Sequence, residues 1–302
     1  MLAIFTNSYD ATSDLIIGHI PKNVSVFRFN SDLLADYSII WKPGNWQITN
    51  LVTSDCLTSS SLTTAYWRKP LEMIAETIPG YHEPFYASEI RYAFREIINS
   101  IIRSHKFRLV EPFAERRVGK FYQLESAARY FNTPDTLYAF NANYSTDLCK
   151  LPVNNGVVAK SISGAQVSEQ NVMYTSKVDL SSIDFSKPWY LQCLINADQD
   201  VTCAFVKGKC YWARRSRNTM GNIIDVRESQ VAGEWENYDA KQQQDSRVIS
   251  LMDDLELDFG RIDFLESNGE LIFLEVNPNG QYAWLDIDNQ HGLIGRVIDE
   301  IL

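Results

Sequence analysis

The sequence contains only five cysteines, and no two of them have Cys-x-x-Cys spacing. An odd number of cysteines without Cys-x-x-Cys spacing disfavours both a disulfide framework and a structural zinc site. We therefore expect reduced thiols in a cytoplasmic protein. The five cysteines are Cys56, Cys149, Cys193, Cys203 and Cys210.

Long apolar runs and a basic leader are also missing. No stretch approaches the roughly 20 apolar residues that a transmembrane helix needs. The first ten residues, MLAIFTNSYD, have too short an apolar run and no basic start for a signal peptide. The sequence therefore predicts no contact with a membrane.

Positive charge is in deficit, with 28 Lys and Arg residues against 38 Asp and Glu and a net charge of -10. Such a chain is poorly suited to binding the phosphates of nucleic acid, so no nucleic-acid partner is expected. Basic residues do cluster at 103–120 and 212–218. Clusters of this kind are usually solvated surface, and the alternative that we keep open is a small anionic ligand.

No glycine-rich phosphate loop follows the first predicted strand, which disfavours a dinucleotide-binding protein. What is present is a composition of 45% hydrophobic and 12% aromatic residues over 302 residues. This is enough for a sizeable core in two domains or one large one. Strands alternate with helices in the first third, which predicts an α/β unit with a partly parallel sheet. The predicted strands there cover residues 2–6, 25–29, 46–53 and 63–68.

Apolar residues recur at helical spacing in several segments. The clearest helix is predicted from Ser88, as its N-cap, to about residue 105. A further helix is predicted over 120–131, and an apolar strand ends near Lys160. The C-terminal part is predicted to contain helices near 245–256 and 293–301, with a β-hairpin between them.

That hairpin, GRIDFLESNGELIFLEVNPNG, raises a question because oxygen-bearing side chains interrupt its apolar runs. A two-residue turn at Asn268-Gly269 would place Asp263 and Glu275 on opposite faces. A three-residue loop, Ser267 to Gly269, would instead pair residue 263 with residue 273. We favour the three-residue loop, because it separates an apolar face from a polar one and the hydrophobic pattern fixes register.

The polar face of this predicted register carries Asp263, Glu275 and Asn277. The other face carries only apolar side chains, which are Ile262, Phe264, Ile272, Leu274 and Val276. Two carboxylates and an amide oxygen suit Mg²⁺ or Mn²⁺ better than zinc, and magnesium sites commonly add substrate phosphates. The competing interpretation is a solvent-facing strand with incidental acids.

A nucleoside triphosphate on such an ion needs further cations, and basic residues precede the hairpin. Lys160 stands out because it ends an apolar strand, where lysine is less expected than on a helix surface. The four histidines, at 19, 82, 105 and 291, form no recognisable triad. The basic candidates are Lys120, Lys160, Arg214, Arg215, Arg217 and Arg227.

The order of these features resembles the ATP-grasp ligases. FLEVNPNGQ (273–281) is similar to their metal-binding strand. VFRFN (26–30), YWRKP (66–70) and GKFYQLESAARYFNTPDTL (119–137) resemble the microviridin-type branch, the graspetide synthetases, which form side-chain esters and amides in ribosomal peptides. The resemblance implies an α/β (α+β) protein, an ATP-grasp fold preceded by an α/β pre-ATP-grasp domain. The implied boundaries are 1–108, 109–190 and 191–302.

By position, the resemblance also implies the roles of individual residues. Lys120 and Lys160 contact the ATP phosphates, and Asp200 contacts the ribose or another part of the nucleotide. Arg215 and Arg227 face the phosphates and steady the reacting group. The implied adenine hinge, which works through backbone groups, is Gln192, Cys193, Leu194 and Ile195. The implied Mg²⁺ ligands are Asp263, Glu275 and Asn277.

Two positions depart from the family pattern. Cys193 stands where the family often has glutamate, and Thr202 stands where it often has arginine. The first removes a nucleotide contact. The second removes a cation, and Arg214 or Arg215 is the candidate to replace it.

The resemblance therefore implies a ligase that uses ATP and Mg²⁺, or Mn²⁺, to activate Asp or Glu side chains of a precursor peptide as acyl phosphates. A hydroxyl or amine of the same peptide then closes a ring. The group is also compatible with a homodimer. Two alternatives stay open: a ligase of small amino acids of the glutathione-synthase kind, and a nucleotide- or peptide-binding homologue without turnover.

Overall fold

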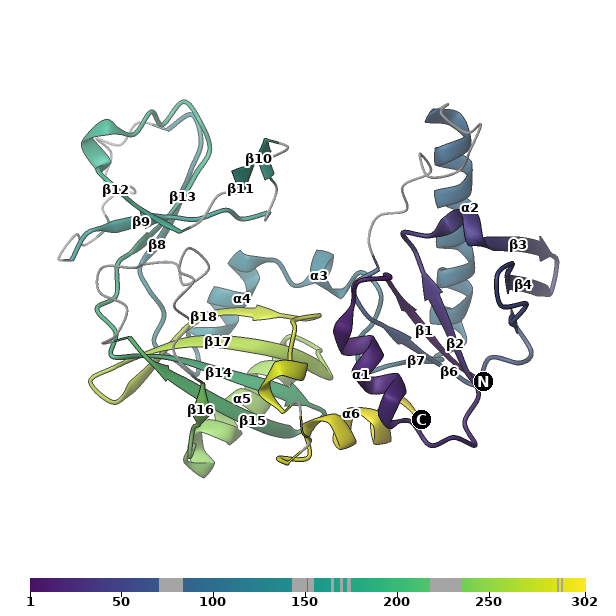
Figure 1. Ribbon diagram of the computed structural model, residues 1–302. Helices are drawn as coiled ribbons and strands as arrows, with labels where there is room; N and C mark the ends of the chain where they lie inside the picture. Colours follow the sequence, from purple (N-terminus) through teal and green to yellow (C-terminus); the bar gives the residue numbers. More distant parts are fainter. Residues whose placement is uncertain are drawn as a thin grey trace.

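The computed structural model spans residues 1–302, and its elements are shown in Figure 1. Arg227, predicted to face the phosphates, lies outside the described residues, as do His82 and Cys149. The structure describes residues 1–70, 84–142, 151, 155–163, 166–168, 171–172, 175–217, 235–286, 288 and 290–302.

A parallel sheet organises the N-terminal part, with strand order β2-β1-β6-β7. Its central strand β1 is buried on both faces, as parallel strands usually are. Ala3 and Phe5 pack toward α2, while Leu2 and Ile4 pack toward α1 and α6. The elements are β1 (Leu2–Thr6), α1 (Ala11–His19), β2 (Val26–Asn30), β6 (Thr64–Trp67), α2 (Pro84–Arg103), β7 (Phe107–Arg108) and α6 (Leu293–Ile301).

The long helix begins earlier than predicted, because α2 starts at Pro84 and Ser88 lies inside it. Proline is well tolerated in a first helical turn, where its missing N–H costs no hydrogen bond. The helix buries Phe94, Ile97, Ile98 and Ile101 as expected.

A small antiparallel sheet, β3-β4-β5, packs beside α2. It contributes Trp46, Ile48 and Leu57 to the core on that side. The sequence predicted only its middle strand. The elements are the short helix η1 (Leu34–Asp36), β3 (Tyr37–Lys42), β4 (Asn45–Asn50) and β5 (Cys56–Thr58).

A second antiparallel sheet, in the order β12-β9-β13-β8, forms the middle part and lies at the upper left of Figure 1. Its small core includes Val157, Ala159 and Leu191. The elements of this part are α3 (Ala114–Arg117), α4 (Lys120–Ala127), β8 (Thr136–Ala139), β9 (Val157–Ala159), β10 (Gln166–Ser168), β11 (Asn171–Val172), β12 (Ser176–Val178), η4 (Leu180–Ser182) and β13 (Trp189–Cys193).

The C-terminal sheet has the order β16-β15-β14-β17-β18. One of its faces packs against α5 through Val201, Cys203 and Phe264, which meet Val248 and Leu251. The opposite face carries the polar residues described below. The elements are β14 (Gln199–Val206), β15 (Lys209–Ser216), β16 (Glu236–Asn237), α5 (Gln242–Asp254), β17 (Phe259–Ser267), β18 (Glu270–Asn277) and η6 (Ala283–Leu285).

The β17–β18 hairpin corrects the predicted register. Ser267 pairs with Glu270 across a two-residue turn, and positive φ angles at Asn268 (53°) and Gly269 (77°) suit a type I′ hairpin. The three-residue loop was therefore wrong. A bulge between the pairs Phe264–Phe273 and Asp263–Glu275 then shifts the register by one residue.

The bulge leaves Leu274 without an opposite partner, and the chain changes faces there. Leu271 and Phe273 are buried in the core, whereas Ile272 and Leu274 are half-buried and not part of it, contrary to the prediction. Beyond the bulge, Asp263 and Glu275 are direct partners. Both carboxylates therefore lie on one face, as predicted, although the register that places them there differs from the predicted one.

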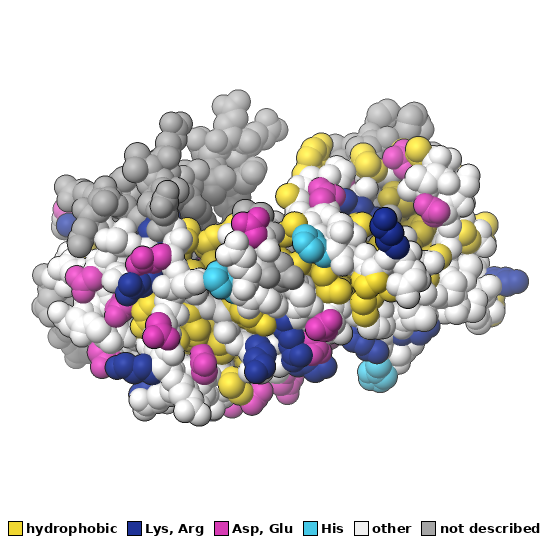
Figure 2. All heavy atoms as spheres, turned by 60° about the horizontal axis from the view of Figure 1, so that its bottom comes forward, with side chains coloured by type: hydrophobic (Ala, Val, Ile, Leu, Met, Phe, Trp, Pro, Cys, Tyr) yellow, Lys and Arg dark blue, Asp and Glu magenta, His cyan; other side chains and the backbone are white. Residues whose placement is uncertain are grey.

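Within the described ranges, no helix has both the length and the apolar character needed to cross a membrane. The four described cysteines, at 56, 193, 203 and 210, form no disulfide with one another. On the face drawn in Figure 2, basic and acidic side chains are interspersed, with hydrophobic side chains between them.

Candidate active site

The predicted donors converge at the end of the β17–β18 hairpin nearest the N-terminal part. Asn277 Nδ2 lies 3.3 Å from Asp263 Oδ2 and 3.3 Å from Glu275 Oε1. The two carboxylate side chains are 25% and 33% exposed, so the cluster is neither sealed nor fully solvated. The cluster therefore presents two carboxylates and one amide together, as the polar face of the hairpin predicted.

Each carboxylate has its own cation. Arg261 reaches Asp263 with two nitrogens, Nη2 at 2.8 Å and Nε at 3.1 Å. Lys120 Nζ lies 3.1 Å from Glu275 Oε2 and donates to the carbonyl oxygen of Ser161 at 3.0 Å. Lys120 is the first residue of α4. The start of this helix and the segment that follows β9, at residues 160–161, therefore both lie at the border of the site.

The two carboxylates titrate differently. Desolvation raises the pKa of Asp263, and the Glu275 charge adds to the rise, against the lowering by Arg261. Burial would raise the pKa of Glu275 as well, but Lys120 and Lys160 together hold it below its ordinary value. Lys160 therefore acts on the same carboxylate as Lys120, and these two predicted phosphate contacts are brought together.

The backbone that carries the donors is held by α4. Gln123, 4% exposed, donates to the carbonyl oxygen of Val276 at 2.9 Å and accepts from its N–H at 2.8 Å. Val276 lies between Glu275 and Asn277. One buried side chain thus replaces a neighbouring strand at this edge and fixes the peptide between two donors.

Asp200 and Arg215 also meet, but each is already engaged. Asp200 accepts from Arg215 at 3.0 Å and from Arg217 at 2.6 Å. The Arg215 guanidinium lies 4.6 Å from the ring centre of Trp235, and its Nε is buried without a hydrogen bond to the described residues. Asp200 is therefore an ion-pair partner here, and a ribose would have to compete with two arginines.

The two departures from the family pattern have structural consequences. Thr202, 2% exposed, donates its hydroxyl to Asp263 Oδ1 at 2.9 Å. The cation beside Asp263 comes from Arg261, which the sequence analysis missed. Arg214 does not supply it, because its side chain pairs with Glu236 at 2.8 Å beside the neighbouring strand. Alternation along β17 was the available signal, since residues 261 and 263 share a face.

The predicted adenine hinge, residues 192–195, begins in the last two residues of β13. The N–H groups of Cys193 and Leu194 donate to the carbonyls of Asp135 and Gly156, both at 2.9 Å. Burial raises the pKa of the Cys193 thiol, so this position is neutral where the family often has a carboxylate. Backbone recognition by these two residues is thereby limited to their carbonyl groups, and Ile195 follows directly.

Gln192 is the first residue of the predicted hinge, and its side chain is buried. It is 2% exposed, and its Nε2 donates to Thr136 Oγ1 at 3.1 Å and to the Tyr190 hydroxyl at 3.2 Å. Its Oε1 is buried with no hydrogen bond to the described residues. A buried acceptor left unpaired costs about 1–3 kcal/mol, and this atom is enclosed by the protein rather than open to a ligand.

The donor chemistry fits a hard divalent cation with phosphate ligands. Within the described ranges, no three His, Cys, Asp or Glu side chains converge, which is unlike a zinc site. Two carboxylates, an amide and two lysines instead match an ion that takes most of its oxygen from phosphates and water. For ligation, the Asn277 amide would present Oδ1 where Nδ2 now faces the carboxylates.

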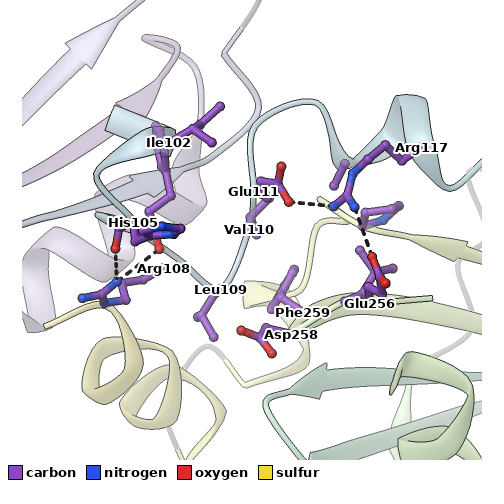
Figure 3. A pocket seen from close by; sticks show the side chains of 14 residues that line it. Ile102, His105, Arg108, Leu109, Val110, Glu111, Arg117, Glu256, Asp258 and Phe259 are labelled. Carbon is purple, nitrogen blue, oxygen red and sulfur yellow. Dashed lines mark hydrogen bonds and ion pairs between the residues drawn. The ribbon is translucent and has the colours of Figure 1, made fainter. Parts of the chain in front are cut away.

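A separate cavity of about 420 Å³ lies between the N-terminal part and β17, and Figure 3 shows it. Its lining includes Ile102, Phe259 and Pro278 but none of the predicted site residues. Three of its charged groups pair with one another, because Arg117 contacts Glu111 at 2.6 Å and Glu256 at 3.4 Å. This cavity offers no reason to move the site away from the hairpin.

Comparison with solved structures identifies the fold. The macrocyclase MdnC of Microcystis aeruginosa MRC, bound with precursor peptide MdnA, aligns over 99% of this chain and 98% of its own, with a TM-score of 0.81 and 22% identity. A RiPP-associated ATP-grasp ligase of Chryseobacterium gregarium, in complex with ADP and a leader and core peptide, aligns over 99% and 96%, with a TM-score of 0.75 and 21% identity.

The likeness extends to a ligase of small substrates. D-alanine–D-alanine ligase of Bacillus anthracis, complexed with ATP, aligns over 99% of this chain and 94% of its own, with a TM-score of 0.57 and 12% identity. No protein-family model and no curated protein matches the sequence. The chain thus has the ATP-grasp fold, as predicted. The resemblance to the peptide-modifying branch is confirmed as a likeness of structure over nearly the whole chain.

Proposed function

We propose that this protein is an ATP-dependent ligase that activates carboxylate side chains of a ribosomal precursor peptide and closes ester or amide rings within it. The observation that carries the proposal is the convergence of Asp263, Glu275 and Asn277 opposite Lys120, in a chain with the ATP-grasp fold. The TM-scores to the macrocyclase and to the RiPP-associated ligase, both solved with peptides, are 0.81 and 0.75. They exceed the value of 0.57 for D-alanine–D-alanine ligase, which favours a peptide substrate.

The chemistry needs positioning and charge neutralisation. A carboxylate oxygen of the peptide attacks the γ-phosphorus of ATP, ADP leaves, and an acyl phosphate results. A hydroxyl or amine of the peptide then attacks the acyl carbon, phosphate leaves, and one proton is released. The net change is one water lost per bond. Because the enzyme contributes mainly placement and electrostatics, no protein nucleophile is required.

Residue roles follow from this proposal. Asp263, Glu275 and Asn277 would hold Mg²⁺, or Mn²⁺, which when bound neutralises phosphate charge. Lys120 and Lys160, which both act on Glu275, would shift toward the phosphates once that charge is satisfied. The buried cation Arg215, 6% exposed, would face the developing acyl phosphate. Arg227 keeps the same role as a prediction.

The adenine would lie at the hinge. Gln192 to Ile195 would bind it through backbone carbonyls. Asp200 would approach the ribose only by exchanging part of its pairing with Arg215 and Arg217. The boundary after residue 108 follows β7, whereas a boundary at 190 cuts β13, so we place the second one after Cys193.

The test combines ATP turnover with peptide dehydration. Purified protein is incubated with ATP and Mg²⁺, alone and with precursor candidates encoded beside this chain that are rich in Thr, Ser, Lys, Asp and Glu. Mass spectrometry should show the loss of one water per bond. Glu275→Gln should lower turnover by about 100-fold or more, whereas Glu270→Gln, an exposed acid on the same strand, should leave it unchanged.

The other outcomes separate the alternatives. Unchanged turnover in both Glu275→Gln and Asp263→Asn would refute the metal assignment. Ligation of free amino acids without peptide dehydration would establish the small-substrate ligase, and ATP binding without turnover would establish the binding homologue. A homodimer and a cytoplasmic location remain predictions, of which the first is checked by light scattering on the purified chain.

A further inference from the structure

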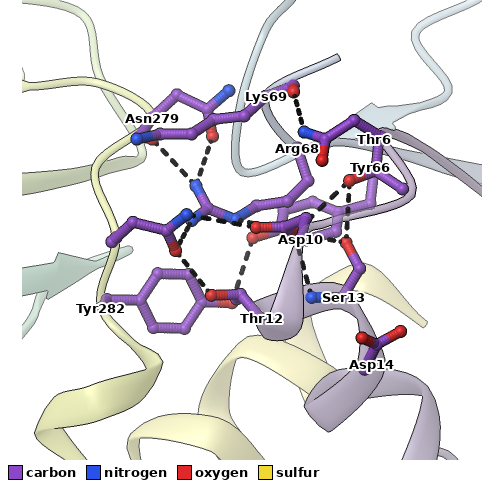
Figure 4. A network of polar contacts seen from close by, with 12 residues as sticks. Thr6, Asp10, Thr12, Ser13, Asp14, Tyr66, Arg68, Lys69, Asn279 and Tyr282 are labelled. Atoms are coloured by element: carbon purple, nitrogen blue, oxygen red, sulfur yellow. Dashed lines mark hydrogen bonds and ion pairs between the residues drawn. The ribbon is translucent and has the colours of Figure 1, made fainter. Parts of the chain in front are cut away.

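Arg68 is a fully buried arginine whose hydrogen bonds leave the N-terminal part. It follows β6 and is 0% exposed. Its Nη1 donates to Asn279 O and Oδ1, both at 2.8 Å, and to Gly280 O at 3.1 Å, while its Nη2 donates to Gln281 Oε1. Figure 4 shows this guanidinium between Asn279 and Asp10. One side chain thus binds three successive residues immediately beyond β18.

A buried acid balances that charge. Asp10 lies 3.5 Å from Arg68 Nε, and the two side chains are 1% and 0% exposed. Asp10 also caps α1 through Ser13 N, at 3.0 Å, and accepts from Gln281 Nε2 at 3.2 Å. Thr12, on the first turn of α1, donates to Gln281 Oε1 at 2.7 Å. The start of α1 and the end of β6 therefore grip the same glutamine.

A gain in the stability of the fold would not by itself explain the buried Arg68–Asp10 pair. Burying two charges costs several kcal/mol in desolvation per ion, and apolar replacements are often neutral or stabilising. A buried network with many hydrogen bonds instead specifies one arrangement of the groups that it joins, and Arg68 Nε contributes an ion pair to it without a hydrogen bond to the described residues. The question is therefore which groups this arrangement fixes.

The bound turn is packed directly against the donors. Gly280 N–H donates to Asn277 O at 3.0 Å, closing a tight turn. A Cβ at Gly280 would lie 2.8 Å from Arg261 Cβ and 3.1 Å from Asn277 Cβ, so only glycine fits. Arg261 Nη1 also donates to Gln281 O at 3.2 Å while its other nitrogens hold Asp263. Moving the turn therefore moves Asn277 and Arg261 together.

We propose that Arg68 is a positioning residue for the candidate metal site. By fixing residues 279–281 against the N-terminal sheet, it sets the placement of Asn277 directly and of Asp263 through Arg261. The inference rests on the proposed function for the meaning of the site, but it adds that the N-terminal part is a component of the metal site. Arg68 itself touches neither nucleotide nor reacting atoms.

The test uses Arg68→Lys in the full-length chain. Lysine keeps a positive charge opposite Asp10, but its donors sit on a single nitrogen and cannot reproduce the planar fork with which Arg68 reaches four acceptors from two nitrogens. We expect the Mg²⁺ concentration for half-maximal ATP turnover to rise by about 10-fold or more, as for other residues that orient metal ligands. Independently of turnover and of metal, amide hydrogen exchange at 275–281 should accelerate in the metal-free protein.

The matched control is Arg28→Lys. Arg28 is also in the N-terminal part, and its partners Asp14, Asn30 and Asn7 all lie there. It should change neither the Mg²⁺ dependence nor the exchange of 275–281. If Arg68→Lys does not fold, Asn279→Ala removes one acceptor of the same link while leaving the Arg68–Asp10 pair, and its Mg²⁺ dependence should shift in the same direction.

The outcomes distinguish this inference from the proposed function. Loss of turnover in Glu275→Gln together with unchanged Mg²⁺ dependence and exchange in folded Arg68→Lys would overturn the positioning role alone. Equal shifts in Arg68→Lys and Arg28→Lys would overturn it as well, because they would indicate a general loss of stability. If exchange at 275–281 accelerates in Arg68→Lys while Glu275→Gln leaves turnover unchanged, Arg68 holds the turn but the metal assignment is refuted.

Discussion

Thr202 is a small, buried residue that contacts Asp263, a predicted metal ligand. It stands where the resembled ligases often have arginine, and its hydroxyl donates to both Asp263 Oδ1 and the carbonyl of Ile262. An arginine there would bring its own charge to Asp263. In this chain the charge comes from Arg261 on the same strand as Asp263, and Thr202 contributes orientation without charge.

The exchange of Thr202 for valine tests that orientation. Thr202→Val keeps the shape and removes the hydroxyl, so the free energy of unfolding should fall by about 1 kcal/mol. Loss of this hydrogen bond should also raise the pKa of Asp263 further and increase the Mg²⁺ requirement. Urea denaturation and a Mg²⁺ titration of ATP turnover measure the two effects. Thr202→Ser should restore both, and a valine variant identical to the unmodified protein would contradict the role.

At the scale of elements, the site depends on a helix that replaces a strand. Among the described residues, β18 is the last strand of its sheet, and its outer edge makes one isolated bridge, from Ile272 to Asn132. Gln123 of α4 satisfies the N–H and carbonyl of Val276, and Asn132 accepts from Phe273 N–H at 2.8 Å. The same helix begins with Lys120, which pairs with Glu275. Helix α4 therefore aligns a cation and the donor strand together.

Gln123→Leu should expose this dependence. It leaves the buried N–H and carbonyl of Val276 unpaired, and at about 1–3 kcal/mol per group the free energy of unfolding should fall by about 2–6 kcal/mol. The change is measured by urea denaturation, and exchange of the Val276 amide should accelerate. On the same helix, the exposed Glu125→Gln should stay within about 0.5 kcal/mol. Equal stability of the two variants would show that the bonds to Val276 do not hold the strand.

The elements also show where sequence reasoning works and where it stops. Apolar periodicity placed α2 and α6, because one buried face is written directly in the residue spacing. The hairpin was predicted with its acids on one face, yet with the wrong turn. A bulge at Leu274 is one extra residue whose position depends on the partner strand, and alternation within one strand does not show it.

At the scale of the whole molecule, buried tyrosines connect the N-terminal and C-terminal parts and place ionisable hydroxyl groups in the interior. Tyr66 and Tyr282, from opposite ends of the chain, share a hydrogen bond of 3.1 Å and are 0% exposed. Burial raises the pKa of both. Tyr190 beside the candidate site has its pKa raised to about 12, by burial and then by the Glu275 charge.

These tyrosines predict sensitivity to high pH. Above a pH of about 10 the unfolded chain loses phenolic protons that the folded protein retains, so the unfolded state binds fewer protons and stability falls as pH rises to about 12. Urea denaturation between these values should show the decline. Tyr190→Phe should reduce its slope, whereas Tyr9→Phe, at a side chain that is 82% exposed, should not. A slope unaffected by Tyr190→Phe would contradict the assignment.

The sequence by itself determined the α/β alternation, the long amphipathic helices and the set of donors at the C-terminal hairpin. These depend on spacing along one element, where period and burial are local consequences of side-chain geometry. Only the tertiary structure decided that Asp200 is held by two arginines and that Arg68 binds the turn beyond Asn277. Those contacts join residues of different elements, up to 213 positions apart, and their partners are chosen by packing in three dimensions.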